Sequence, residues 1–505
     1  MPISVEVALL SGKAVQVEVE LDETVEDLRQ RAQALLGARG RLVSESGVPF
    51  DPQTSVADAG LDDGSVTVLY VAALSLAASH GAFAAIFDGS LLSWGDPRAR
   101  VTNALEEQLK GVQEVQATQS AFAAILADGS VLAWGDPQSG GVTGGVQRFL
   151  TDVRQIQASR SAFAAILGDG SAVAWGHEVW GGMMRGVWHS LKNVQHIQAT
   201  GGAFAAICEH GSVVTWGMQE DGGDSRAVQD QLKGVQAIQA TRYGAFAAIL
   251  QDGSVVTWGD PKGGGDSGAV QEELRDVRHV QATSSAFAAI LADGSVVTWG
   301  RLQDGGDSRA VQRHLKGVQC IQATHFAFAA VLEGGSVVTW GDPRSGGDSR
   351  AVHEQLQNVQ QIQATWSAFA AILDDGSVVT WGDAQNGGDS TSVRAQLKDV
   401  RQIQATGMAF AAILDGGSVV TWGNAQFGGD SRAVQGQLVN VKHIQATSSA
   451  FAAILAGGFV VTWGDRQDGG DSTAVERQLR PAPPRPVQRA VATSSKKGKG
   501  PRRRK

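Results

Sequence analysis

Seven aspartates recur at one position of a repeated sequence and raise the question of a metal site. Each follows two glycines and precedes a serine. The seven are Asp224, Asp266, Asp307, Asp348, Asp389, Asp430 and Asp471. Regular aspartates in glycine-rich loops bind calcium in β-rolls, but there the carboxylates recur on every stacked turn. Here one carboxylate recurs per repeat, and capping a short helix explains the same Asp-Ser pair. No metal or other cofactor is therefore expected.

Residues that act as nucleophiles or bases are few and scattered. The chain has ten histidines and two cysteines, Cys208 and Cys320. None of them falls in an HExxH motif or a comparable ligand spacing. Cys208 replaces a leucine of the next repeat and Cys320 an alanine, so both are expected to be small residues in or near the core. Because catalysis needs unlike groups held close together, the sequence favours a protein that is not an enzyme.

Aromatic and arginine side chains appear where the repeats differ from one another. One variable window follows "QAT" or "QAS", and the other comprises the residues after Trp-Gly. Such side chains at exposed loop tips are typical of binding hot spots. The candidates for partner binding are Arg160, Trp180, Arg242, Tyr243, His325, Phe326, Trp366, Met408 and Phe427.

The element that must position these loops is a repeat of about 41 residues. A Trp-Gly pair recurs ten times between Trp94 and Trp463 at intervals of 40 to 42 residues. Such a period is typical of stacked units that bury their apolar faces against one another. Ten units account for residues 72–480, and the closure of ten units into one ring is left open by the sequence.

Each unit is predicted to hold three strands and a short helix. In one copy, residues 238–241, 245–250 and 254–258 are the expected strands, with Asp252-Gly253 as the turn before the last. The "AFAAIL" strand is apolar on both faces, which indicates a sheet packed between two others. Residues 222–232 carry turn and cap residues followed by a short helical pattern. Radial repetition of such units predicts a mainly β fold, a ten-unit β-propeller.

The sequence "GVQAIQATRYGAFAAILQDGSVVTWGD" (234–260) resembles the repeat of the regulator of chromosome condensation. It is most similar to the three-stranded form found in the propeller-type β-lactamase inhibitor superfamily. The resemblance covers about four-fifths of the chain and implies a β-propeller that binds proteins. Two features depart from the family: it usually has seven blades, and its Gly-Gln after Trp-Gly is replaced here by Gly-Gly-Asp-Ser.

Residues 1–71 precede the repeats and are predicted to form a separate domain. Alternating apolar residues predict a hairpin over 3–21, Asp22 or Thr24 caps a helix that ends at Gly37, and further strands follow near 41–44 and 65–71. This order resembles the ubiquitin-like β-grasp fold. The resemblance implies that Val43 and Leu69 match ubiquitin's apolar recognition patch and could bind partners from the ubiquitin pathway.

The last 25 residues, 481–505, are rich in proline and then in basic residues. They carry nine Lys and Arg and no acid, so a chain with net charge −9 has −18 on the rest. This tail is expected to be disordered. Its candidate localisation residues are Lys496, Lys497, Lys499, Arg502, Arg503, Arg504 and Lys505. They favour a cytoplasmic or nuclear protein, and nucleic acid is expected to bind only through this tail, if at all.

These patterns together predict a non-enzymatic scaffold whose propeller loops bind a protein partner, with a link to the ubiquitin pathway through the N-terminal domain. Two alternatives remain open. One is a guanine-nucleotide exchange regulator of a small GTPase near chromatin, as the family resemblance allows. The other is the substrate-recognition subunit of a ubiquitin ligase. No membrane span is expected, because no run of residues is long and apolar enough.

Overall fold

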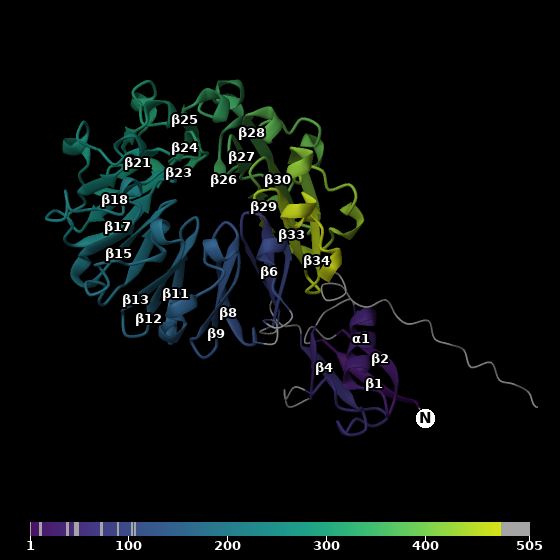
Figure 1. The fold of residues 1–505 in the computed structure, drawn as a ribbon. Coiled ribbons are helices and arrows are strands. Elements are labelled where there is room, and N and C mark those ends of the chain that lie inside the picture. Colours follow the sequence, from purple (N-terminus) through teal and green to yellow (C-terminus); the bar gives the residue numbers. More distant parts are fainter. Residues whose placement is uncertain are drawn as a thin grey trace, which may run out of the picture. The chain divides into compact units, whose positions relative to one another are not determined.

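The computed structural model describes residues 2–9, 13–36, 40–44, 50–70, 74–87, 90–102, 105 and 108–475. The chain forms two compact units, one within Met1–Val71 and the other within Ala72–Arg480. Figure 1 shows both, with the first in purple and the second running from blue to yellow. Among the described residues, no helix is both long enough and apolar enough to span a bilayer.

The first unit is a four-stranded sheet with one helix. Its elements are β1 (Pro2–Ala8), β2 (Ala14–Glu20), α1 (Val25–Leu36), β3 (Arg41–Val43) and β4 (Val66–Tyr70). The strand order is β2-β1-β4-β3, with β1 and β4 parallel. The helix begins where predicted, because Thr24 Oγ1 accepts the N–H of Asp27 while Asp27 Oδ2 accepts that of Thr24. The predicted hairpin and helix are thus confirmed.

The predicted apolar patch of this unit is wrong. Val43 and Leu69 are 6% and 0% exposed, so neither side chain is available to a docking partner. Leu69 packs in the core cluster that contains Leu28 and Leu36 of α1. The alternation of β4 therefore turns Thr67 and Leu69 inward, while Val66 is exposed.

The second unit contains ten three-stranded antiparallel sheets, named here blades 1 to 10 in chain order. Blades 1 to 5 comprise β5 (Leu74–Ala78), β6 (Ala82–Phe87), β7 (Ser90–Gly95); β8 (Val112–Ala117), β9 (Ala121–Leu126), β10 (Val131–Gly135); β11 (Val153–Ala158), β12 (Ala162–Leu167), β13 (Ala172–Gly176); β14 (His196–Ala199), β15 (Ala203–Ile207), β16 (Val213–Gly217); and β17 (Val235–Ala240), β18 (Ala245–Leu250), β19 (Val255–Gly259).

Blades 6 to 10 repeat the pattern. They comprise β20 (Val277–Ala282), β21 (Ala286–Leu291), β22 (Val296–Gly300); β23 (Val318–Ala323), β24 (Ala327–Leu332), β25 (Val337–Gly341); β26 (Val359–Ala364), β27 (Ala368–Leu373), β28 (Val378–Gly382); β29 (Val400–Ala405), β30 (Ala409–Leu414), β31 (Val419–Gly423); and β32 (Val441–Ala446), β33 (Ala450–Leu455), β34 (Val460–Gly464). The predicted three-stranded unit is confirmed.

The middle strand of each blade explains why the same residues recur. In blade 5, Phe246 and Ala248 pack in the cluster shared with blade 4, whereas Ala245, Ala247 and Ile249 pack in the cluster shared with blade 6. All but Ile249 are fully buried. Small side chains on alternate positions let neighbouring sheets approach closely, so both faces of "AFAAIL" are interior, as the sequence predicts.

A tryptophan hydrogen bond ties each blade to the one before it. The indole Nε1 of Trp258 donates to the carbonyl of Gly222, 3.0 Å away in the loop that leaves blade 4. Nine of the ten blades make this bond, namely those with Trp94, Trp175, Trp216, Trp258, Trp299, Trp340, Trp381, Trp422 and Trp463. Each indole also stacks on the phenylalanine of its own middle strand, as Trp258 does on Phe246 at 5.1 Å.

The exception is Trp134, whose buried indole has no partner among the described residues. Its acceptor would come from blade 1, where Arg100 stands in place of the first glycine of Gly-Gly. Gly140, the equivalent residue in blade 2, has a left-handed backbone with φ of 93°, whereas Arg100 is extended with φ of −80°. A non-glycine residue avoids the left-handed conformation, so the carbonyl is not presented to the indole.

The ten blades close into one ring, which the sequence left open. Trp94 of blade 1 donates to the carbonyl of Gly469, which follows blade 10, at 3.1 Å. Phe83 and Ala85 of β6 share a core cluster with Ala450 and Ala452 of β33. Figure 1 shows this seam, where the first blue strands lie beside the last yellow ones. The second unit is therefore a closed β-propeller.

The predicted short helix is smaller than expected. It is a single 3₁₀ turn in several blades, such as η8 (Gln271–Glu273). The Asp-Ser pair before it fixes the turn: Asp266 Oδ1 accepts the N–H of Gly268, and Ser267 Oγ lies 2.9 Å from Thr257 Oγ1. Gln271 completes the link by donating to the carbonyl of Val255. The recurrent aspartates thus close a local turn, but the predicted N-cap role is wrong, because Val270 is the N-cap residue of η8 and no side chain caps it.

Candidate binding surface

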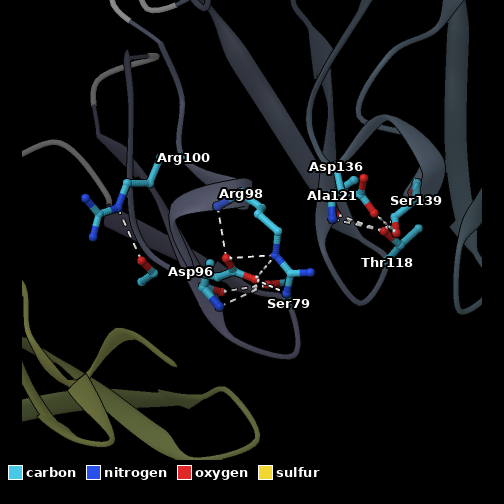
Figure 2. Close-up of polar contacts among 10 residues, drawn as sticks. Ser79, Asp96, Arg98, Arg100, Thr118, Ala121, Asp136 and Ser139 are labelled. Atoms are coloured by element: carbon cyan, nitrogen blue, oxygen red, sulfur yellow. Dashed lines mark hydrogen bonds and ion pairs between the residues drawn. The ribbon is translucent and has the colours of Figure 1, made fainter. Parts of the chain in front are cut away.

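Both variable windows lie at the same end of the propeller. The threonine that ends the first strand joins them, because its hydroxyl donates to a carbonyl in the loop after Trp-Gly. Figure 2 shows this in blade 2, where Thr118 Oγ1 donates to the carbonyl of Ser139 at 2.9 Å and also accepts the N–H of Ala121. The contact is repeated in blade 6 between Thr283 and Asp304. One end of the ring therefore carries the residues that vary.

A belt of backbone hydrogen bonds holds the variable window that follows "QAT" or "QAS" in place. In most blades, the first residue after the recurrent threonine or serine donates its N–H to the carbonyl of its counterpart in the next blade, and in blade 5 the second residue does so. The donors are His80, Gln119, Arg160, Tyr243, Ser284, His325, Trp366, Gly407 and Ser448, and Ser448 completes the ring by bonding to His80. Within the described residues, the belt is interrupted only between Gly201 and blade 5, which has one extra residue in this link. The variable side chains thus project from a rigid ring of backbone.

These side chains surround a cavity of about 930 Å³ at the centre of the ring, which we call the mouth. Every blade contributes to its lining. Six of the nine candidates from the sequence line it: Arg160, Trp180, Arg242, Tyr243, His325 and Trp366. A volume of this order lies within the range of ligand pockets in proteins.

The other three candidates are not among the residues found to line the mouth. Phe326 is half-buried and contacts His325 edge to face, with ring centroids 5.8 Å apart. Phe427 lies edge to face against Trp366 at 5.9 Å. Met408 is half-buried, and its carbonyl accepts the N–H of Asn424. Phe326 and Phe427 therefore support residues of the mouth from behind.

Several lining residues were not identified from the sequence. Gln119, Asp221, Ser284 and Ser448 all line the mouth. Three of them, Gln119, Ser284 and Ser448, occupy the same repeat position as Arg160, and only their ordinary residue types hid them. Aligning that position across all ten copies would have found them.

Arg160 is held by two neighbours in the mouth. Its Nε donates to Gln119 Oε1 of blade 2 at 2.7 Å. Its guanidinium carbon lies 5.3 Å from the ring centroid of Trp180, a cation–π contact. These contacts use one of the five N–H groups of the guanidinium and leave the others for a ligand.

Arg242 belongs to a chain of contacts across blades 5 to 9. Its Nη1 lies 3.3 Å from Nε2 of His325, and His325 stacks on Trp366 with ring centroids 5.7 Å apart. Burial, together with the charge of Arg242, lowers the pKa of His325 to about 4. His325 is thus neutral at physiological pH and can accept the hydrogen bond without offsetting the charge of Arg242.

The charge in the mouth differs from that around it. Its charged lining residues among those described are Arg160, Arg242 and Asp221. Burial raises the pKa of Asp221, and the nearby Glu220 and Asp260 raise it further. Farther from the centre, arginines such as Arg226 and Arg350 pair with the aspartate two residues earlier. Among the described residues, the two guanidinium groups that line the mouth have no such carboxylate partner.

The cysteines carry no sign of reactivity. Cys208 is buried as predicted, and burial raises the pKa of its thiol. Cys320 is exposed, which corrects the prediction of a near-core residue. Partial burial of its sulfur still raises the pKa of that thiol, so the thiolate is not favoured. The described residues contain no group of three or more His, Cys, Asp or Glu side chains that could hold a metal ion.

The candidate localisation residues Lys496, Lys497, Lys499, Arg502, Arg503, Arg504 and Lys505 lie outside the described residues. The predictions that concern the tail 481–505 therefore rest on its sequence alone.

No protein-family model and no curated protein matches this sequence. Among solved structures, the computationally designed Ika8 protein aligns at 13% identity over 62% of this chain and 97% of its own, with a TM-score of 0.29. Prp20p, the RCC1 protein of Saccharomyces cerevisiae, aligns at 16% identity over 54% and 72%, with a TM-score of 0.30. The ectodomain of the receptor kinase CR4 from Physcomitrella patens aligns at 14% identity over 53% and 72%, with a TM-score of 0.31. At these scores, the propeller architecture rests on the ten sheets of this chain and their closing seam.

Proposed function

We propose that this chain is a non-enzymatic scaffold that binds a protein partner at the mouth of its propeller. One observation supports this most directly: chemical variety is concentrated around a single cavity, while the blades beneath it are nearly uniform. Aromatic and arginine side chains on a rigid backbone ring provide contact area and hydrogen bonds with little loss of conformational entropy on binding.

Site-specific cross-linking tests this proposal. A photoreactive amino acid at Tyr243, which is 51% exposed and lines the mouth, should capture the partner from cell extract. The change Trp366→Ala should lower this capture about tenfold or more, since aromatic hot spots typically contribute 2 kcal/mol or more. Trp188→Ala is the matched control, because Trp188 is 59% exposed and is not among the residues that line the mouth. Equal losses in both variants would overturn the proposal.

Narrower roles are also proposals. The ubiquitin-like resemblance of residues 1–71 supports a link to the ubiquitin pathway, and co-purification of a ligase with the full chain would test the role of recognition subunit. The burial of Val43 and Leu69 excludes them as docking residues for a ubiquitin-pathway partner.

The exchange-regulator alternative predicts faster nucleotide release from at least one member of a panel of small GTPases.

We also propose that the basic tail directs the protein to the nucleus. Seven Lys and Arg lie between Lys496 and Lys505. Replacing them with Gln in a fluorescent fusion should shift the protein toward the cytoplasm. An unchanged distribution would favour a solubilising role for the tail.

A further inference from the structure

Two arginines of the mouth share a property that suggests what the mouth binds. Arg160 and Arg242 come from blades 3 and 5, and both line the same cavity. Among the described residues, neither forms an ion pair with a carboxylate, although both are held by other side chains. We propose that the mouth receives an acidic linear segment of a protein partner, whose carboxylates bind Arg160 and Arg242 and whose apolar side chain packs on Trp366. This inference rests on the proposed function and names the chemistry of the partner.

Both guanidinium groups are positioned before a ligand arrives. Gln119 and Trp180 fix Arg160. His325 fixes Arg242, and Trp366 in turn stacks on His325. Side chains already held in one conformation lose less entropy on binding, which favours affinity. Their free N–H groups can receive a carboxylate with two parallel hydrogen bonds.

The charges elsewhere on the chain favour a narrow acidic segment over a large acidic surface. The chain without its tail carries −18, which repels an acidic domain that would cover the whole end of the ring. Several arginines outside the mouth are neutralised locally, as in the pairs Arg226–Asp224 and Arg432–Asp430. Inside the mouth two guanidinium groups face one carboxylate, that of Asp221. A peptide that enters the cavity therefore meets positive charge that a broad partner would not reach.

The acidic charge around the mouth disfavours a nucleic acid as the ligand. Stacking on aromatic rings and binding to arginine also suit single-stranded nucleic acids. Such a ligand continues beyond the cavity as a polyanion, however, and its phosphates would lie against an acidic body. A short segment with acidic residues on either side of an aromatic residue can end within the mouth and need not extend over that acidic surface.

Fluorescence anisotropy with the full chain tests the inference. The probes are a short labelled peptide of Glu, Asp and Trp, the same peptide with Gln in place of each acid, the same with Lys, and a short single-stranded DNA. The acidic peptide should bind at least about tenfold more tightly than the Gln peptide and should weaken with added salt. Arg160→Gln and Arg242→Gln should each raise its Kd about tenfold. Arg344→Gln is the matched control and should leave the Kd unchanged, because Arg344 is exposed and is not among the lining residues.

Three results would overturn the inference: preference for the Lys peptide, tighter binding of the DNA, or an acid preference that both mouth variants leave unchanged. Its failure is distinguishable from failure of the proposed function. If cross-linking at Tyr243 still depends on Trp366, the mouth binds a partner of another chemistry. If that dependence is also absent, the proposed function fails too.

Discussion

Among single residues, His325 best shows how the ring creates chemistry that no repeat contains alone. It contacts Arg242, 83 positions earlier, and Trp366, 41 positions later. Burial and the nearby guanidinium both disfavour its protonated form. A histidine that stays neutral can accept a hydrogen bond from Arg242 and so keep that side chain aimed at the mouth.

His325 should therefore titrate with a pKa of about 4 in the folded protein, against 6.5 for the ordinary side chain. Between these values the unfolded chain binds more protons, so this residue should lower the free energy of unfolding as the pH falls from 6.5 to 4. Above pH 6.5 its contribution is complete. NMR titration, with the signal assigned by its loss in His325→Gln, measures the pKa. A midpoint near 6.5 would contradict the proposed contacts, and His325→Gln should reduce the acid sensitivity of unfolding.

Six of the candidates from the sequence line the mouth, but the sequence did not reveal their contact partners. Arg160, Arg242 and Trp366 could be found because near-identical copies reveal the positions that the scaffold does not dictate. The pairing of Arg242 with His325 could not be found, because it depends on the angle between blades that are not adjacent. Gln119 and Ser284 were missed because their types are ordinary, although their repeat position is the same.

At the scale of the element, the glycines after Trp-Gly decide how closely blades approach. Gly305 has φ of +100°, and a Cβ there would lie 2.5 Å from Cδ2 of Phe328 in the next blade. Its carbonyl also accepts the indole bond of Trp340. The position requires glycine both for its backbone and for its space.

Three alanine substitutions separate these two requirements. Gly436→Ala meets neither strain nor contact and should be nearly neutral. Gly334→Ala has φ of +92° and open space, so it should cost about 1–2 kcal/mol of unfolding free energy. Gly305→Ala should cost at least about 1 kcal/mol more, because it also overpacks the seam. Urea denaturation compares the three, and equal losses at 305 and 334 would contradict the close approach.

A second comparison concerns the indole bond itself. Trp134 and Trp216 are equally buried and stack on Phe122 and Phe204 in the same way, at 5.3 and 5.2 Å. Only Trp216 donates across the seam, to Gly181. Trp216→Phe should therefore reduce the free energy of unfolding by about 1 kcal/mol more than Trp134→Phe. A larger loss for Trp134→Phe in urea denaturation would show that its indole has an acceptor.

The strands were easier to predict than the elements against which they pack. Periodicity and the Asp-Gly turn defined the three strands of a blade, because these features are local. The sequence did not define which face of β4 is buried. Val66, Val68 and Tyr70 form an apolar alternation in the sequence that is as clear as the one that includes Leu69. Packing on α1 decides that Thr67 and Leu69 face inward, which places Leu69 in the core.

For the whole propeller, closure is the step that no single repeat determines. The wedge angle of each blade, multiplied ten times, decides between a ring and an open spiral, and small errors accumulate. In the structure each blade is built from three consecutive strands, so no strand is exchanged across the seam. Blade 10 is held to blade 1 by packing, by the Trp94 bond and by the contacts of His80 with Ser448.

This seam differs from the others in one respect, since the propeller chain does not cross it. Gly469→Ala and Gly428→Ala introduce the same clash, with Cβ 2.6 Å from Cδ2 of Phe83 and of Phe451 respectively. Both should lower the Tm by a similar amount. Below the Tm, only Gly469→Ala should raise the radius of gyration measured by small-angle X-ray scattering, because the chain still links blades 9 and 10 across the other seam. If the two variants expand equally, closure is no weaker than an ordinary contact between blades, and the backbone belt around the mouth becomes the element that holds the ring together.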